Sequence, residues 1–252
     1  MHRFFVDQEQ IGNDAVRITG ADVNHIRNVL RLRTGDEILV VARGDEDAWE
    51  YTCRISEADP ERILAAITDA QRPGRELPSQ MFLLQALPKA DKMDLVIQKA
   101  VELGVYAVIP VVTERCVVRL DEKKAEKRIL RWNRIAESAA KQARRSRVPE
   151  VTRPLTLTEA LAKIESASAE VRLIPYEHET DMNETRRRLG GVRPGMDVAV
   201  LIGPEGGFAK TEVEEARASG FAPVSLGSRI LRTETAGLCL LSALMLQIDP
   251  GN

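Results

Sequence analysis

The chain has 252 residues, of which 44% are hydrophobic, 29% charged and 4% aromatic, and its formal net charge is −2. Such a length allows one large or two modest domains, and the small net charge gives no overall signal for a nucleic-acid partner. Three isolated cysteines and three histidines argue against a zinc site or a disulfide framework. The start lacks a signal-peptide core, and no apolar run approaches the about 20 residues of a membrane span. We therefore expect a cytoplasmic protein without metal or membrane association.

Short β-type segments separated by turn residues fill residues 1–72 and predict a small barrel or sandwich. A short helix and a Gly-Asp turn are expected between the first two strands, at residues 22–36. Basic side chains gather there and could hold phosphates, although the same pattern is typical of a solvated helix face. The expected strands are 15–19, 37–42, 49–55 and 63–68, and the basic cluster is His25, Arg27, Arg31 and Arg33.

A polar stretch rich in Pro and Gly, Arg72 to Pro78, separates this part from the rest, so we expect domains at 1–72 and 73–252. Beyond it, continuous apolar runs of the buried-strand kind alternate with helical patterns. This alternation is typical of a parallel α/β layer. The runs are 81–87, 107–112, 170–174, 198–202 and 222–226.

Apolar residues at steps of three and four predict a long helix over 121–147. Residues 121–153 hold eleven Lys and Arg against five Asp and Glu, and the basic residues follow the same steps on the other side of the helix. A solvated face is the ordinary explanation. We favour RNA contact, because the rest of the chain is slightly acidic and one-signed clustering is typical of a polyanion partner. The basic side comprises Lys127, Arg131, Arg134, Lys141 and Arg145.

The run at 198–202 stops at a glycine turn, Gly203 to Phe208, and the strand at 222–226 leads into a second one. Thr211 and Glu214 have the spacing of a capping box for the helix between them, and a last helix is expected over 234–248. The first turn matches neither a P-loop nor the G-x-G-x-x-G fingerprint. Two adjacent turns could still bind an adenine edge and a ribose through backbone groups, or the glycines only shape tight turns. In the binding interpretation Leu226, Ile230 and Leu231 enclose the ring.

The two turns, LIGPEGGF at 201–208 and SLGSRILRTETA at 225–236, closely resemble the signature of the RsmE family. These SPOUT-superfamily enzymes methylate N3 of a uridine in small-subunit (16S) ribosomal RNA with S-adenosyl-L-methionine. Residues 25–36, the helix at 89–104 and Thr113-Glu114-Arg115 resemble further family segments. One departure is Gln142-Ala143-Arg144-Arg145, where the family pattern has Gln-Ser or Gln-Cys followed by Gly-Arg.

The resemblance implies a PUA-like β-barrel before a SPOUT methyltransferase domain with a parallel sheet and a C-terminal trefoil knot. It also implies a homodimer with active sites near the subunit interface, and 16S ribosomal RNA as the partner. Arg115 joins the candidate RNA contacts His25, Arg27, Arg31, Arg33, Arg134, Lys141 and Arg145. The candidate cofactor contacts are Gly203, Pro204, Gly206, Leu226, Gly227, Ile230 and Leu231.

Uracil N3–H is a weak acid, so its methylation needs a base or a cation that stabilises the negative charge on the neighbouring carbonyl oxygens. Arg232 could polarise a carbonyl, and Glu205 or Glu234 could accept the proton. Alternatively, Glu234 only favours the N-terminus of the last helix and Arg232 is its ion-pair partner. The competing functions are another SPOUT methyltransferase acting on tRNA or on a ribose 2′-OH, and an RNA-binding assembly factor without catalysis.

Overall fold

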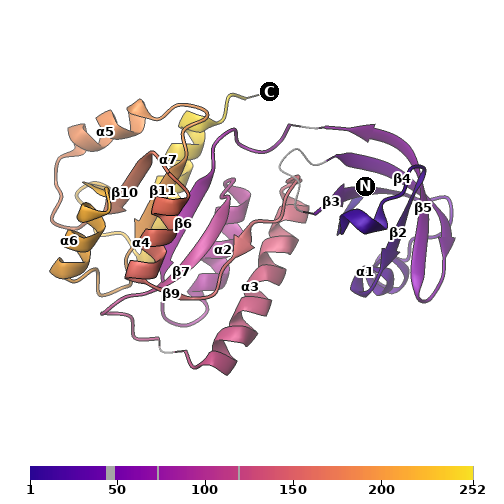
Figure 1. Cartoon of the computed structure of the whole chain (residues 1–252), viewed down its shortest axis with the longest axis horizontal. Helices are drawn as coiled ribbons and strands as arrows, with labels where there is room; N and C mark the ends of the chain where they lie inside the picture. Colours follow the sequence, from indigo (N-terminus) through magenta and orange to yellow (C-terminus); the bar gives the residue numbers. More distant parts are fainter. Residues whose placement is uncertain (44–48, 73, 119, 252) are drawn as a thin grey trace. The chain divides into compact units, whose positions relative to one another are not determined.

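The computed structural model describes residues 1–43, 49–72, 74–118 and 120–251 (Figure 1). The chain forms two compact units. The first contains Met1–Glu76 and Ala140–Val148, and the second contains Leu77–Ala139 and Pro149–Asn252. Pro73, which is part of the predicted linker, lies outside the described residues. The domain boundary between 72 and 73 stays a prediction.

The first unit is built on one curled five-stranded sheet. Its first and second strands in spatial order are parallel, and the other neighbours are antiparallel. Alternate apolar residues of every strand face one core, which Val23 and Ile26 of the short helical segment complete. This confirms the predicted small β domain, and the first strand, which was not predicted, adds Phe4 and Val6 to the core. The spatial order is β1 (His2–Val6), β3 (Glu37–Ala42), β4 (Glu50–Ala58), β5 (Arg62–Gln71) and β2 (Ala15–Thr19), with η1 (Gln8–Gln10), α1 (Ala21–Asn24) and the π-helix η2 (His25–Val29) between strands.

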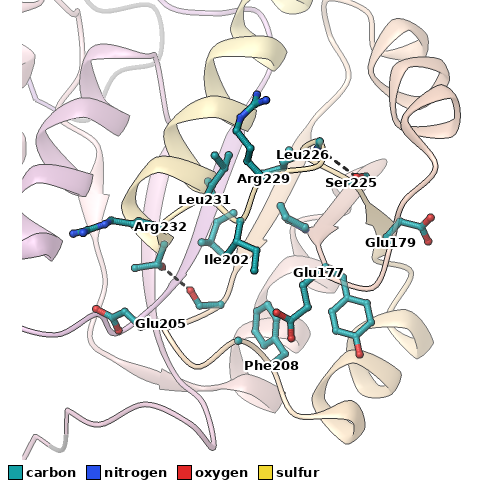
Figure 2. Close-up of a pocket in the computed structure, with 18 of the residues that line it drawn as sticks. Glu177, Glu179, Ile202, Glu205, Phe208, Ser225, Leu226, Arg229, Leu231 and Arg232 are labelled. Carbon is teal, nitrogen blue, oxygen red and sulfur yellow. Dashed lines mark hydrogen bonds between the residues drawn. The ribbon is translucent and has the colours of Figure 1, made fainter.

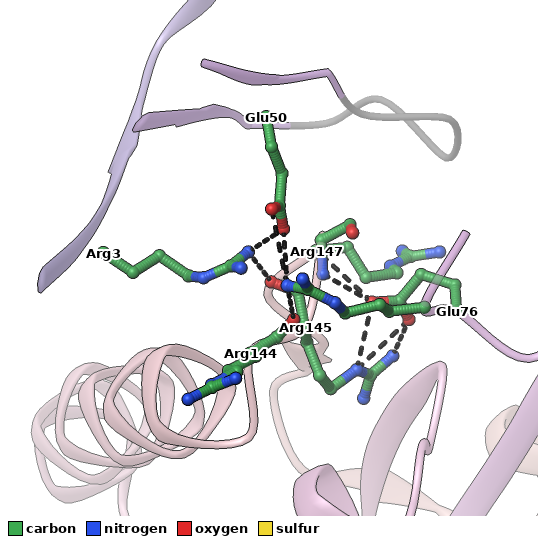
Figure 3. A network of polar contacts seen from close by, with 8 residues as sticks. Arg3, Glu50, Glu76, Arg144, Arg145 and Arg147 are labelled. Atoms are coloured by element: carbon green, nitrogen blue, oxygen red, sulfur yellow. Dashed lines mark hydrogen bonds and ion pairs between the residues drawn. The ribbon is translucent and has the colours of Figure 1, made fainter. Parts of the chain in front are cut away.

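Two carboxylates join residues 140–148 to this unit (Figure 3). Glu50, whose side chain is fully buried, pairs with Arg3 and with Arg75, whose guanidinium groups donate to the backbone carbonyls of Arg145 and Arg144 at 2.9 and 3.4 Å. Glu76 pairs with Arg145, which is 5% exposed, and accepts hydrogen bonds from the next two backbone amides at 2.8 and 3.2 Å. Because a buried charge is costly without a partner, these contacts fix the segment.

The second unit is a seven-stranded sheet in which the paired strands run parallel. Strands β6 and β11 are buried along their whole length, as the continuous apolar runs predict. One face packs against α4 and α6, while Leu83 and Ile202 point to the other face beside α7. The sheet order is β12 (Ala222–Val224), β10 (Val171–Pro175), β11 (Val198–Ile202), β6 (Met81–Ala86), β7 (Ala107–Val112) and β8 (Glu150–Val151), with β9 (Leu155–Thr156) also on β7. The helices are α2 (Lys92–Glu102), α3 (Glu122–Gln142), α4 (Leu157–Ser166), α5 (Met182–Gly191), α6 (Lys210–Ala218) and α7 (Thr233–Ile248).

Two local predictions were wrong. The helix predicted over 121–147 ends at Gln142, because Arg144 adopts a left-handed conformation with φ +57°. The capping box predicted for Thr211 and Glu214 also fails, since α6 begins at Lys210 and the carboxylate of Glu212 accepts a hydrogen bond from the Ala209 N–H.

Within the described residues no helix is long and apolar enough to cross a membrane. The trefoil knot stays a prediction.

Replacing Glu76 with alanine should destabilise the protein strongly. The change leaves the Arg145 guanidinium buried without the carboxylate of Glu76. The free energy of unfolding should therefore fall by about 3–5 kcal/mol. Urea denaturation measures this difference. Glu37→Ala, which breaks only the exposed pair with Arg54, should cost about 0–1 kcal/mol, and equal losses for the two variants would contradict the assignment.

Candidate functional site

Two glycine turns meet at one edge of the second sheet. They follow β11 and β12, which flank β10, and the carboxyl ends of parallel strands lie together. Between them is a cavity of about 670 Å³, of the size usual for small-molecule sites (Figure 2). Its walls come from the end of β10, the two turns and the starts of α2, α5 and α7. The lining residues are Lys92, Pro175, Tyr176, Glu177, Glu179, Thr180, Met182, Ile202, Gly203, Pro204, Glu205, Gly207, Phe208, Ser225, Leu226, Gly227, Ser228, Arg229, Ile230, Leu231, Arg232, Thr233 and Ala236.

Close packing shapes the first turn. A Cβ on Gly203 would lie 3.0 Å from the Phe208 ring, so a side chain at this position would displace the ring that floors the cavity. The Gly203 carbonyl accepts a hydrogen bond of 2.6 Å from the Thr233 hydroxyl, which itself accepts one of 2.9 Å from the buried amide of Gln85. The turn is therefore tied to the start of α7 and to the middle of the sheet.

The second turn depends on one left-handed residue, Gly227, whose φ of +102° disfavours any side chain. Its N–H donates to the Ser225 hydroxyl at 3.3 Å, and the Ser225 N–H donates to the Thr185 hydroxyl at 2.9 Å. Ser225 and Thr185 are both buried. The backbone groups of this turn are consequently held in place by α5.

A buried carboxylate supports the first turn from behind. Glu212, which is 8% exposed, accepts hydrogen bonds from the backbone amides of Ala209 and Glu114 at 2.9 and 2.8 Å. The adjacent Arg115 donates to the Gly206 carbonyl at 2.9 Å. Gly206 thus packs against Arg115, and it is not among the residues that line the cavity.

Lys92 links the first turn to the start of α7 electrostatically. Its Nζ lies 2.9 Å from Glu205 Oε1 and 3.3 Å from Glu234 Oε2, and the Lys89 amide also donates to Glu205. The hydrogen bond to Glu205 raises the pKa of Lys92. Burial raises the pKa of Glu205, but hydrogen bonds from Lys92 and from backbone amides outweigh burial and hold it below its ordinary value. At neutral pH the Lys92–Glu205 pair is therefore fully charged.

The structure brings most of the predicted cofactor and catalytic residues together. Glu205 and Arg232 lie on one side of the cavity, and Glu177 and Glu179 lie on the other (Figure 2). Glu234 is not a lining residue, but it pairs with Lys92, which is one. The predicted cofactor contacts on the cavity wall are Gly203, Pro204, Leu226, Gly227, Ile230 and Leu231.

Sequence reasoning missed the third wall of the cavity, which follows β10. Tyr176, Glu177 and Glu179 come from a polar segment with no glycine signature, and only the neighbouring position of β10 between β11 and β12 brings it to the turns. Lys92 also gave no signal beyond that of an ordinary surface lysine. Knowledge of the strand order would have found both.

The predicted RNA contacts divide between the two units. His25, Arg31 and Arg33 are exposed on the first unit, where Arg27 is half-buried. Lys141 pairs with Asp22, and Arg145 is committed to Glu76, so both charges have partners within the first unit. Arg134 is exposed on α3, and Arg115 lies beside Gly206 in the second unit. Direct contact of these residues with RNA stays a prediction.

The lining suits a nucleoside-like ligand with a charged tail. Ile202, Leu226 and Leu231 offer apolar surface for a flat ring, and the turns offer backbone N–H and C=O groups for its polar edge. Glu177 and Glu179 can accept hydrogen bonds from hydroxyl or ammonium groups. Ile230, which also lines the cavity, is 89% exposed.

Comparisons with known proteins agree with this geometry. A family model described as an RNA methyltransferase domain matches residues 75–245, and one described as an RNA methyltransferase PUA domain matches residues 18–68. Ribosomal RNA small subunit methyltransferase E of Bacillus subtilis is 34% identical over 255 residues, which cover 99% of this chain and 98% of that protein. The relative of the same name from Aquifex aeolicus is 31% identical, with 97% and 99% covered. The crystal structure of the Neisseria gonorrhoeae protein of that name, bound to S-adenosyl methionine, is 36% identical with a TM-score of 0.82, covering 97% of this chain and 96% of that chain.

The Lys92–Glu205 pair should make stability depend on pH at both extremes. A carboxylate with a lowered pKa contributes stability above its unfolded value of 4.5 and loses it as the pH falls through the folded value. A lysine with a raised pKa contributes below 10.5 and loses it as the pH rises through the folded value. The difference in unfolding free energy between wild type and Glu205→Gln should be constant near neutral pH and shrink below 4.5 and above 10.5. Denaturant titrations across the pH range measure it, and a difference that never changes would refute the pairing.

Proposed function

Because the chain belongs to the ribosomal RNA small subunit methyltransferase E family, we propose that it methylates N3 of a uridine in 16S ribosomal RNA of the small subunit. The enzyme is an RNA methyltransferase that uses S-adenosylmethionine. The observation that carries the proposal is the cavity between the two glycine turns, with Arg232 on its wall. A non-catalytic RNA binder would have no use for two turns closed around a small-molecule site.

The residues present fit S-adenosylmethionine. In the proposed arrangement Leu226 and Leu231 cover the adenine, and the backbone of Gly203 and Gly227 meets its polar edge. Glu177 or Glu179 accepts hydrogen bonds from the ribose hydroxyls or the ammonium group. When bound, the cofactor supplies an electrophilic methyl group on a positively charged sulfur.

Charged side chains of the protein would promote the loss of the N3 proton from the uracil. We assign to Arg232 the stabilisation of the negative charge that spreads onto the carbonyl oxygens when N3 loses its proton. Glu205 is a weak proton acceptor in the free enzyme, because its pKa is lowered and Lys92 already binds it. Glu205 and Glu234 remain the proposed acceptors, and either carboxylate must leave Lys92 before it can take the proton.

N3 lies on the Watson–Crick edge, so the target base must be unpaired or flipped when it enters the site. We propose that the exposed basic residues of the first unit and Arg134 hold the surrounding RNA backbone. A homodimer is part of the proposal, and the exposure of Ile230, an apolar residue that lines the cavity, supports a site completed by RNA or by a second subunit. A ribosomal RNA substrate places the reaction in the cytoplasm.

Deletion of the gene should remove one methylated uridine from small-subunit RNA. An N3 methyl group blocks base pairing and stops reverse transcriptase, so primer extension on RNA from the deletion strain should lose one stop, and a plasmid copy should restore it. If every 16S stop persists and a tRNA or ribose modification disappears, the substrate assignment is wrong. If no modification disappears, the proposed methylation of ribosomal RNA by this chain is wrong.

Replacing Arg232 with methionine should lower kcat by about 10²- to 10³-fold, the usual effect of removing a donor to a developing negative charge. Calorimetry should give an unchanged affinity for S-adenosylmethionine, because the assigned partner of Arg232 is the uracil. Arg217→Met, on the exposed side of α6, is the matched control and should behave as wild type. A loss of cofactor affinity as large as the loss of kcat/KM would instead make Arg232 a cofactor contact.

A further inference from the structure

Gln85 is a polar residue inside a buried apolar strand. It is the one polar residue of the run at 81–87, and its exposed fraction is 0%. Its side chain lies on the face of the sheet that packs against α7, where Leu83 also points. An apolar side chain would fill this position without the cost of burying an amide. The amide therefore requires an explanation.

Only the nitrogen of this amide is used. It donates to the Ala86 carbonyl at 3.0 Å and to the Thr233 hydroxyl at 2.9 Å. Because a carbonyl can only accept a hydrogen bond, the Ala86 contact requires the nitrogen on this side of the amide. Within the described residues no donor reaches the buried Oε1, which lies 3.5 Å from the position that a Cβ on Gly237 would occupy. A buried oxygen without a hydrogen bond lowers stability.

The amide nitrogen fixes the direction of the hydrogen bond that Thr233 donates. A hydroxyl has one proton, and an oxygen that accepts from Gln85 directs that proton to another neighbour. This neighbour is the carbonyl of Gly203, which accepts at 2.6 Å. Thr233 and Gly203 both line the cavity, whereas Gln85 does not. The influence of Gln85 on the cavity therefore passes through Thr233.

We propose that Gln85 is a positioning residue for S-adenosylmethionine. Its amide orients the Thr233 hydroxyl, and the hydroxyl holds the Gly203 backbone in the conformation that receives the cofactor. The inference rests on the proposed function, which places the cofactor between the two glycine turns. Without the amide donor the hydroxyl can rotate and the Gly203 peptide loses its anchor. Binding must then order the turn, which lowers the affinity.

Replacing Gln85 with methionine removes both polar groups and keeps an unbranched side chain of similar length. Calorimetry should show the Kd for S-adenosylmethionine rising about three- to tenfold, the effect of one hydrogen bond. The KM for S-adenosylmethionine should rise by the same factor, while kcat and the KM for RNA change less than about twofold. Without cofactor the melting temperature should stay within about 2 °C of wild type, because removing the unpaired oxygen offsets the lost donors. Gln85→Leu should give the same rise in Kd.

Ser79→Ala is the matched control. Ser79 is buried and accepts a hydrogen bond of 2.9 Å from the Gly195 amide, at the opposite edge of the sheet before β6 and β11 begin. Its loss should lower the melting temperature by about 2–4 °C and leave the Kd for S-adenosylmethionine unchanged. If Gln85 only stabilises the fold, Gln85→Met will show this same pattern, and the positioning role is wrong.

Variants of Thr233 test the route. Thr233→Ser keeps the hydroxyl and should bind S-adenosylmethionine nearly as wild type does, whereas Thr233→Val should bind at least as weakly as Gln85→Met. In the Thr233→Val background, Gln85→Met should cause no further loss of affinity, because both changes break the same link. Additive losses would show that Gln85 acts by another route and would overturn the proposal.

Binding by the wild-type protein separates this inference from the proposed function. If wild type binds S-adenosylmethionine and Gln85→Met binds it equally well, the positioning role fails and the function stands. If wild type does not bind S-adenosylmethionine, with or without RNA, the proposed function fails and the positioning role fails with it.

Discussion

The hydroxyl of Thr233, at the residue that follows the second glycine turn, ties that end of the chain to the first glycine turn. It donates to the Gly203 carbonyl and accepts from Gln85, so the first residue of α7, the end of β11 and the middle of β6 share one chain of hydrogen bonds. Thr233 is 6% exposed, and a hydrogen bond shielded from water is costly to leave unmade. The cavity walls keep their spacing because this link is internal, and two of the lining residues, Gly203 and Thr233, form it themselves.

Lys92 makes a second link on the cavity wall, and this link is ionic. It joins Glu205 of the first turn to Glu234 of α7 by charge, with side chains that are 15–28% exposed. Such a link can open when a substrate group competes for one of the partners, whereas the Thr233 link cannot open without exposing buried polar groups. The cavity thus combines a wall held by buried hydrogen bonds with a wall held by partly exposed ion pairs.

Sequence periodicity predicted four of the five strands of the first unit, all but β1. It also predicted β6, β7 and β11, because burial on both faces leaves a continuous apolar run. It could not predict that β10 lies between β11 and β12, since strand order depends on long-range pairing. For that reason Glu177 and Glu179 were missed while Gly203 and Gly227 were found. The end of α3 was misjudged for a related reason: the arginine pattern continues past Gln142, but the contacts of Glu76 draw the following residues into the other unit.

Two carboxylates, Glu212 and Glu76, accept backbone hydrogen bonds where the chain enters or leaves a helix. Glu212 gathers two amides at the start of α6, and Glu76 gathers two amides and a guanidinium after α3. Each carboxylate accepts hydrogen bonds from backbone N–H groups of the adjoining irregular segment. Each is therefore unavailable to neutralise a cation at the surface. Arg145 and Arg144 illustrate the division. Arg145 is buried and pairs with Glu76. This ion pair helps to fix the turn, and Arg144 on the same turn is exposed to solvent. At this turn the buried ion pair and the exposed cation therefore follow from the same contacts.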